Sequence, residues 1–229
     1  TLKAYIAEVL QHRDLLLYLE GGRSYSGALK PLKTGLLHAA LLAQHSDLVI
    51  VPMAIAYDLV LEDHVLAKQG VKRRQRRFTY EIAEMVRDAV GYQSRAFVTF
   101  GQPIPTAHCD PDSRRDIMRL SHQMRDAIGR LYKVLPTAVL AAAIRPSITT
   151  SVLKARIDDL LDTLRLVKAN LDVTSGQQVI EQATAPLVAR GVIVVEGDRY
   201  RVRDRIVLRY YARTIQHLLT SSSNAVRLH

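Results

Sequence analysis

Short apolar runs alternate with helical patterns along the first hundred residues. Apolar side chains that recur every three to four positions predict amphipathic helices, and unbroken apolar runs bounded by turn residues predict buried strands. The predicted helices cover residues 2–13, 34–44 and 78–90, and the predicted strands cover residues 15–19, 48–57 and 96–100. This alternation predicts an α/β fold, a mixed sheet with flanking helices and substantial parallel character.

The pattern changes beyond residue 110. Ser113 and Asp116 resemble a capping box that opens a helix over 114–132, and two prolines mark residues 135–147 as a hinge or a packed connection. The remaining predictions are helices over 150–170 and 177–190, a hairpin turning at Gly197-Asp198, and a last helix over 204–220. We therefore place a boundary near residue 147: residues 1–147 form an α/β domain, and residues 148–229 form a smaller, mainly helical C-terminal domain with a β-hairpin.

Composition excludes several classes of protein. The chain is 48% hydrophobic and 24% charged, which excludes disorder, and its single cysteine, Cys109, excludes an internal disulfide or a cysteine-rich zinc site. No apolar run approaches the ~20 residues that a membrane span needs. Lys3, Glu8 and Arg13 break up the opening segment, so no signal peptide is visible, and the chain starts inside a predicted helix. We expect a fragment whose N-terminal part is missing.

Net charge points to an anionic partner. The chain carries a formal charge of +10, with most of the excess after residue 110. Such a surface attracts phosphate, whether in nucleic acid, in lipid headgroups or in a nucleotide cofactor, and composition does not choose among the three.

A polar segment with two glycines follows the first predicted strand. It consists of Glu20, Gly21, Gly22, Arg23 and Ser24. Ligands of open α/β sheets bind at the carboxyl ends of strands, and glycines let a ligand approach the backbone closely. An arginine fork suits phosphate, while a glutamate suits substrate hydroxyls or holds the arginine. On spacing alone, a polar turn with an Arg–Glu ion pair is the favoured alternative.

Four segments, in order along the chain, resemble the glycerol-3-phosphate acyltransferase family of bacterial, membrane-associated enzymes. The strand that ends in Glu-Gly-Gly-Arg-Ser resembles the family's third block. The other three segments are Lys33-Thr34-Gly35, the strand Ile50–Asp58 with its internal Pro52, and the stretch Arg209–Leu219, which is similar to the family's Tyr-Tyr-x-x-x-Ile-x-His signature. The resemblance covers almost the whole chain and implies an acyltransferase-like α/β domain in residues 1–147.

Two departures limit what is carried over. Tyr25 stands where bacterial members usually have arginine. The family's catalytic dyad, His-x-x-x-x-Asp, and its second block are absent. His108–Asp112 and His122–Asp126 have three intervening residues rather than four, and both lie after the first three family-like segments rather than before them. We therefore assign no catalytic residue, interpret the chain as the latter part of such an enzyme, and expect it to be inactive without the missing N-terminal part.

The resemblance implies a substrate site and a reaction. The implied reaction moves an acyl chain from acyl-CoA or acyl-carrier protein to glycerol 3-phosphate, the first step of phospholipid synthesis, with no metal or other cofactor. Dihydroxyacetone phosphate is the alternative acceptor within the family. The implied substrate-binding residues are Glu20, Gly21, Gly22, Arg23, Ser24, Lys33 and Pro52.

Two further readings concern charge. The basic run Lys72, Arg73, Arg74, Arg76 and Arg77 suits contact with an anionic membrane or with CoA, and a solvated loop is the equal alternative. The first interpretation implies a peripheral enzyme on the cytoplasmic face of a membrane. Residues 150–205 also have a winged-helix outline, typical of nucleic-acid binding, but helix 177–190 offers only Arg190 as a basic residue. A groove-reading helix needs more donors, so we expect no nucleic-acid partner.

Overall fold

The computed structural model describes residues 2–22, 24–43, 47–60, 63–71 and 94–220. The chain divides into two compact units. The first unit contains Thr1–Arg23, Lys30–Ala54 and Thr99–Leu131, and the second contains Ser24–Leu29, Ile55–Val98 and Tyr132–His229. Helices and small sheets occur together in this arrangement, so the predicted mixed α/β class is confirmed. The predicted boundary near residue 147 stays a prediction.

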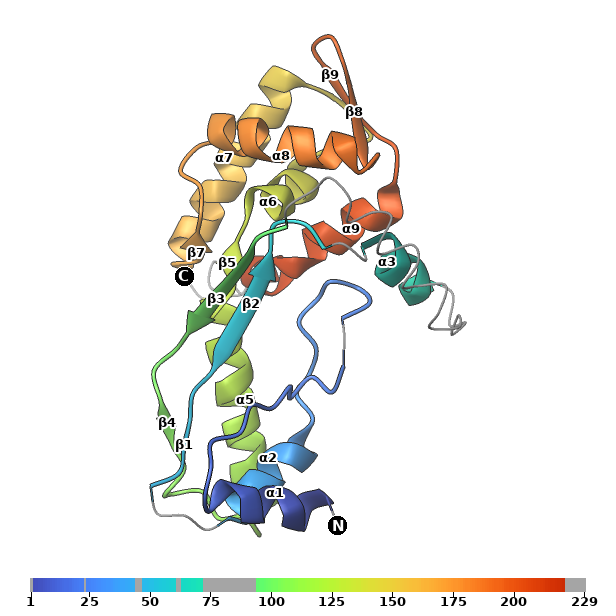
Figure 1. The fold of residues 1–229 in the computed structure, drawn as a ribbon. Coiled ribbons are helices and arrows are strands. Elements are labelled where there is room, and N and C mark those ends of the chain that lie inside the picture. Colours follow the sequence, from blue (N-terminus) through green and yellow to red (C-terminus); the bar gives the residue numbers. More distant parts are fainter. Residues whose placement is uncertain (1, 23, 44–46, 61–62, 72–93, 221–229) are drawn as a thin grey trace. The chain divides into compact units, whose positions relative to one another are not determined.

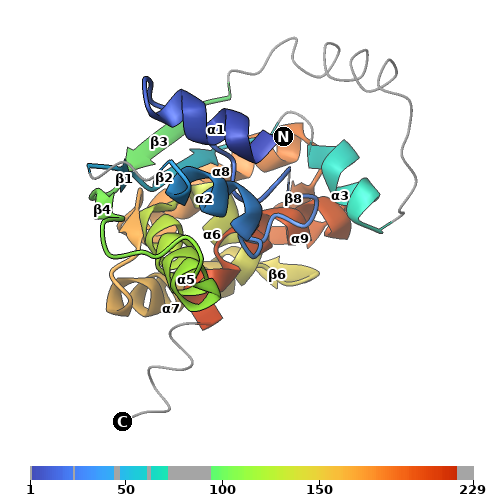
Figure 2. The same ribbon diagram turned by 90° about the horizontal axis from the view of Figure 1, so that it is seen from below.

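The first unit is built around three helices, α1 (Leu2–Leu10), α2 (Thr34–Leu41) and α5 (Arg114–Leu131). Helices α1 and α2 lie side by side, as Figures 1 and 2 show. The core side chains of this unit are Leu19, Leu37, Leu41, Ile104, Leu120 and Met124. The hydroxyl of Ser113 accepts a hydrogen bond from the Asp116 amide at 3.3 Å, which confirms the predicted start of α5.

Proline divides the predicted strand 48–57 into two. Strand β1 (Val49–Ile50) pairs antiparallel with β4 (Ile104–Pro105), and β2 (Met53–Tyr57) pairs with β3 (Ala96–Phe100). Pro52 lies at the break, because it has no N–H to donate to a ladder. Its carbonyl accepts a hydrogen bond from the Gly101 amide at 2.8 Å.

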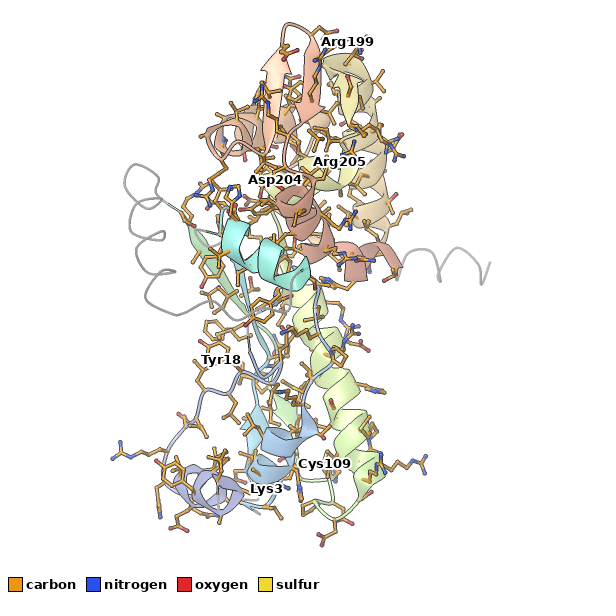
Figure 3. The ribbon with its side chains drawn as sticks, turned by 90° about the vertical axis from the view of Figure 1, so that its right-hand side faces the viewer. Lys3, Tyr18, Cys109, Arg199, Asp204 and Arg205 are labelled. Carbon is orange, nitrogen blue, oxygen red and sulfur yellow. The ribbon has the colours of Figure 1, made fainter. Side chains whose placement is uncertain are left out.

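The predicted strand 15–19 is wrong. Residues 14–18 form neither helix nor strand, and Leu16 and Tyr18 are 61% and 66% exposed. Figure 3 labels Tyr18 on this extended segment. A strand is stable only when another strand satisfies its backbone groups, and no strand in the described part of the chain pairs with this one. Only Leu19 is buried. The predicted helix 78–90 lies outside the described residues.

The second unit contains most of the helices. Its elements are α3 (Asp63–Val71), β5 (Lys133–Val134), α6 (Pro136–Ala143), β6 (Ser147–Thr149), α7 (Thr150–Leu166), β7 (Asn170–Leu171), α8 (Gly176–Ala189), β8 (Ile193–Glu196), β9 (Arg199–Val202) and α9 (Arg205–Thr214). Residues 135–147 were predicted to be a hinge or a packed connection. They form a packed connection that contains helix α6. Pro136 begins α6, and the whole of this helix except Ala142 is buried.

The two helices and the hairpin predicted within residues 150–205 are present, whereas the winged-helix interpretation stays a prediction. Strand β6 joins the predicted hairpin in the order β6-β9-β8, and the sheet follows α7 and α8 in the chain. Figure 1 shows the hairpin extending beyond α8. Asp158 on α7 accepts a hydrogen bond from the Gly176 amide at the start of α8, at 2.6 Å, and this bond lowers the pKa of Asp158.

Within the described residues, no helix combines the length and apolar character that crossing a bilayer requires.

Candidate functional site

Residues 20–33, which we call the glycine-containing loop, connect the extended segment 14–19 to α2, and main-chain hydrogen bonds shape the first half of this loop. The Gly21 amide donates to the Tyr18 carbonyl at 3.0 Å, and the Lys33 amide donates to the Leu19 carbonyl at 2.8 Å. One carboxylate oxygen of Glu20 accepts a hydrogen bond from the Lys30 amide at 3.0 Å. Glu20 therefore fixes the backbone at Lys30, in the irregular segment that leads to α2.

Gly21 lies directly beneath the side chain of Lys33. A Cβ atom at position 21 would come within 2.5, 2.6 and 2.8 Å of Cδ, Cε and Nζ of Lys33, and the backbone of Gly21 has φ +67°. Gly22 also has positive φ, at +142°. Both conformations favour glycine, and at position 21 a side chain would also push the lysine away. The absence of a side chain thus places an ammonium group on the exposed loop, where an anion can reach it.

The second half of the loop belongs to the second unit. The Ser24 hydroxyl donates to the Ala28 carbonyl at 2.7 Å, and the Ala28 amide donates to the Ser26 hydroxyl at 3.3 Å. Gly27 has φ +79°, and a Cβ there would lie 2.1 Å from the carbonyl oxygen of Tyr210. This half of the loop is therefore a tight turn packed on α9.

The other predicted site residues lie apart from this group or cannot be placed. Glu20, Gly21 and Lys33 come together in the first unit. Pro52 lies in the same unit, at the break between β1 and β2. Arg23 and the run from Lys72 to Arg77 lie outside the described residues, so their predicted roles stay predictions.

Asp58 closes the family-like segment Ile50–Asp58 and is held in place by Arg95. Its Oδ1 accepts the Arg95 amide at 2.8 Å, and its Oδ2 accepts the Arg95 Nε–H at 2.9 Å. The Leu59 amide donates to the same Oδ1 at 2.7 Å. Because Asp58 is buried and used in this way, its carboxylate joins the end of β2 to the residue before β3.

A buried acid that the sequence analysis missed lies at the start of α3. Asp63 is completely buried, pairs with the Arg190 guanidinium, and accepts a hydrogen bond from the Tyr211 hydroxyl at 2.6 Å. The Val60 amide donates to that hydroxyl at 3.1 Å. Burial and the Asp63 charge raise the pKa of Tyr211 far above its usual range. The Tyr-Tyr signature was the available signal, whereas nothing in the sequence near Asp63 marks it.

The structure also contains a His–Asp pair without dyad spacing. The Nδ1 atom of His64 lies 3.5 Å from Oδ2 of Asp204, and its Nε2 lies 3.2 Å from the Arg190 carbonyl oxygen. Asp204 in turn caps α9 through the amides of Ile206 and Val207, at 2.9 and 3.0 Å (Figure 3 labels Asp204). Both ring nitrogens of His64 therefore face protein groups, a carboxylate on one side and a carbonyl oxygen on the other. This pair joins α3 to α9.

The known proteins that are similar to this chain are named as acyltransferases. Residues 1–56 match the family described as Acyltransferase. A Mycobacterium tuberculosis protein named as an acyltransferase is 30% identical over 62% of this chain and 25% of its own length. Two proteins named glycerol-3-phosphate acyltransferase each align with 96% of this chain and 32% of their own length. The one from Shewanella loihica is 25% identical, and the one from Glaesserella parasuis is 24% identical.

The chain therefore spans about a quarter to a third of the length of the relatives that it matches. The two glycerol-3-phosphate acyltransferase matches cover nearly the whole chain, as the four family-like segments do. The predicted resemblance is confirmed: residues 1–56 match the acyltransferase family, and the chain as a whole is similar to the glycerol-3-phosphate acyltransferases.

Proposed function

We propose that this chain supplies the acceptor-binding part of a glycerol-3-phosphate 1-O-acyltransferase. The observation that carries the proposal is the packing of Lys33 over Gly21, which presents an ammonium group on the loop inside the family-matched residues 1–56. A phosphate is the anion that such a lysine beside a glycine backbone suits. Arg23 and Ser24 follow Gly22 in the sequence, and their phosphate-binding roles are part of the proposal. Glu20 provides a carboxylate on the glycerol side of the same loop.

The proposed step makes an ester and releases a thiol. The primary hydroxyl oxygen of glycerol 3-phosphate attacks the thioester carbonyl carbon of acyl-CoA or acyl-carrier protein, and a general base takes the hydroxyl proton. The carbon–sulfur bond then breaks, and the thiolate leaves and is protonated. The family's His-x-x-x-x-Asp dyad supplies that base, and it has to come from residues outside this sequence. Dihydroxyacetone phosphate is the competing acceptor.

Lys33→Met is expected to weaken binding of glycerol 3-phosphate about tenfold or more, because a charged hydrogen bond contributes ~1.5–3 kcal/mol. Isothermal titration calorimetry of the chain with glycerol 3-phosphate measures this loss, and glycerol and dihydroxyacetone phosphate serve as comparison ligands. The control is Lys3→Met, which removes the same charge from α1 (Figure 3). Equal affinities of Lys33→Met and the unchanged chain would contradict the phosphate role of Lys33.

We further propose that the protein works at the cytoplasmic surface of an anionic membrane. Besides the run from Lys72 to Arg77, the hairpin offers a basic face. Arg199 and Arg201 lie on β9 on either side of buried Tyr200, Arg203 follows the strand, and all three arginines are exposed. Arg205 follows at the start of α9, and Figure 3 labels Arg199 and Arg205. A row of arginines on one strand face suits lipid phosphates. By contrast, α8 has no lysine or arginine to read a nucleic-acid groove.

Replacing Arg199, Arg203 and Arg205 with glutamine is expected to reduce sedimentation of the chain with phosphatidylglycerol vesicles. At ~1 kcal/mol per arginine, the loss is about a hundredfold in partition at low salt, and screening reduces it as salt rises. The control removes equal charge from α5 through Arg114, Arg115 and Arg130. A second variant replaces Arg73, Arg74, Arg76 and Arg77. If both hairpin and control variants sediment alike, the hairpin does not face lipid.

A further inference from the structure

Helix α9 packs against the end of the glycine-containing loop. A Cβ at Gly27 would lie 2.1 Å from the carbonyl oxygen of Tyr210 and 3.0 Å from its carbonyl carbon. Those separations are too short for any side chain, so the loop backbone rests directly on the helix backbone. The segment Ser24–Leu29 accordingly groups with the second unit and not with the residues before and after it. The glycine-containing loop and the family-like segment Arg209–Leu219, which are far apart in sequence, are thus in contact.

Helix α9 is itself fixed next to this contact. Tyr211, the neighbour of Tyr210, is 2% exposed and donates its hydroxyl to buried Asp63 at 2.6 Å. The rings of Tyr210 and Tyr211 meet edge to face, with centroids 5.7 Å apart. Asp204 caps the first turn of α9. The helix backbone at Tyr210 is therefore anchored from the side of α3 and from its own N-terminus.

Two hydrogen bonds to Ala28 link the Gly27 contact to Ser24 and Ser26. Gly27 precedes Ala28, whose carbonyl accepts the Ser24 hydroxyl at 2.7 Å and whose amide donates to Ser26 at 3.3 Å. Because Gly27 packs on α9, the position of Ala28 is fixed, and the hydrogen bond to the Ala28 carbonyl in turn holds the Ser24 side chain. A residue at position 27 with a side chain would lift the turn from the helix.

We propose that Gly27, Tyr210 and Tyr211 are positioning residues: α9 holds the second half of the loop, Ser24–Leu29, in the folded turn that the loop keeps when it binds the acceptor. The identity of the ligand rests on the proposed function, whereas the contact itself does not. Gly27 packs against the backbone carbonyl of Tyr210, and the Tyr211–Asp63 hydrogen bond fixes the position of the helix at this contact.

The test compares two glycines with similar backbone conformations. Gly27→Ala adds a methyl group that meets the Tyr210 carbonyl, whereas Gly191→Ala bears a similar conformational strain, at φ +65°, with nothing within 4 Å. The readouts are cleavage of the Tyr25–Ser26 bond by chymotrypsin, followed by mass spectrometry, and the affinity for glycerol 3-phosphate by calorimetry. Tyr25 is 45% exposed, so its cleavage reports opening of the loop.

Gly27→Ala is expected to raise the rate of cleavage after Tyr25 at least tenfold and to lower the affinity for glycerol 3-phosphate at least tenfold. Its melting temperature is expected to be close to that of Gly191→Ala. Tyr211→Phe, which keeps the ring and loses the bond to Asp63, is expected to show smaller changes in the same direction and serves if Gly27→Ala does not fold. Equal cleavage in the two glycine variants would overturn the proposal, and so would faster cleavage with unchanged affinity. If the unchanged chain binds no glycerol 3-phosphate, the proposed function fails, while cleavage still decides whether α9 holds the loop.

Discussion

Asp63→Asn is expected to lower the free energy of unfolding by about 3–5 kcal/mol, because breaking a buried ion pair leaves the other charge in a poorly solvated place. The Arg190 side chain is 11% exposed and the Asp63 side chain is fully buried. The asparagine keeps the size of the side chain and can still accept from Tyr211. The loss therefore comes mainly from the missing charge opposite Arg190.

Urea denaturation followed by circular dichroism measures this effect, and Asp159→Asn is the matched control. Asp159 is an exposed acid on α7, where such a change is expected to shift stability by less than about 0.5 kcal/mol. Tyr211→Phe, which removes one hydrogen bond to the same carboxylate, should fall between the two at about 1–3 kcal/mol. A decrease of under ~1 kcal/mol for Asp63→Asn would show that the Asp63–Arg190 pair contributes little.

The 229-residue chain assayed alone is expected to transfer no acyl group to glycerol 3-phosphate. The reaction needs a base at the attacking hydroxyl, and no histidine here has the family's dyad spacing. Loss of a general base alone typically lowers rates by ~10²–10⁴. His64, which lies within 4 Å of Asp63 and Asp204, has its Nε2 3.2 Å from the Arg190 carbonyl oxygen.

A radiolabelled acyl-transfer assay checks this expectation in three mixtures. These are the chain alone, the chain with a separately expressed piece of a relative that carries the dyad, and the intact relative as a positive control. Activity only on mixing would support the proposed acceptor-binding role. Activity of the chain alone that disappears in His108→Ala or His122→Ala would mean that one of these histidines is the base, and that our assignment of the family segments is wrong at the step that matters most.

Local signals predicted much of the fold. Helix α5 follows from its capping residues and its amphipathic pattern, and the β8–β9 hairpin follows from the turn at Gly197-Asp198. These features depend on neighbours in sequence. The predicted strand 15–19 failed because apolar residues predict burial but do not supply a pairing strand. Pro52 was noted in the sequence, yet the division of its strand into β1 and β2 depends on pairing with β4 and β3.

The candidate site was predicted only in part, for the same physical reason. Glu20, Gly21 and Lys33 were identified from motifs, and the structure brings them together. The packing of Gly27 on α9 and the Asp63–Arg190–Tyr211 cluster join residues that are far apart in sequence. No periodicity or spacing connects such residues, because their partners are chosen by tertiary packing.

The contact between Gly27 and Tyr210 also has a consequence for biosynthesis. The two residues are separated by roughly 180 positions, so at ~5–20 residues per second a ribosome adds Tyr210 about 10–40 seconds after Gly27. During that interval the nascent loop has its full motif but lacks the helix on which it rests. A translation product that stops before α9 would therefore contain every residue of the glycine-containing loop and leave its second half unfolded, exposed to proteases and chaperones.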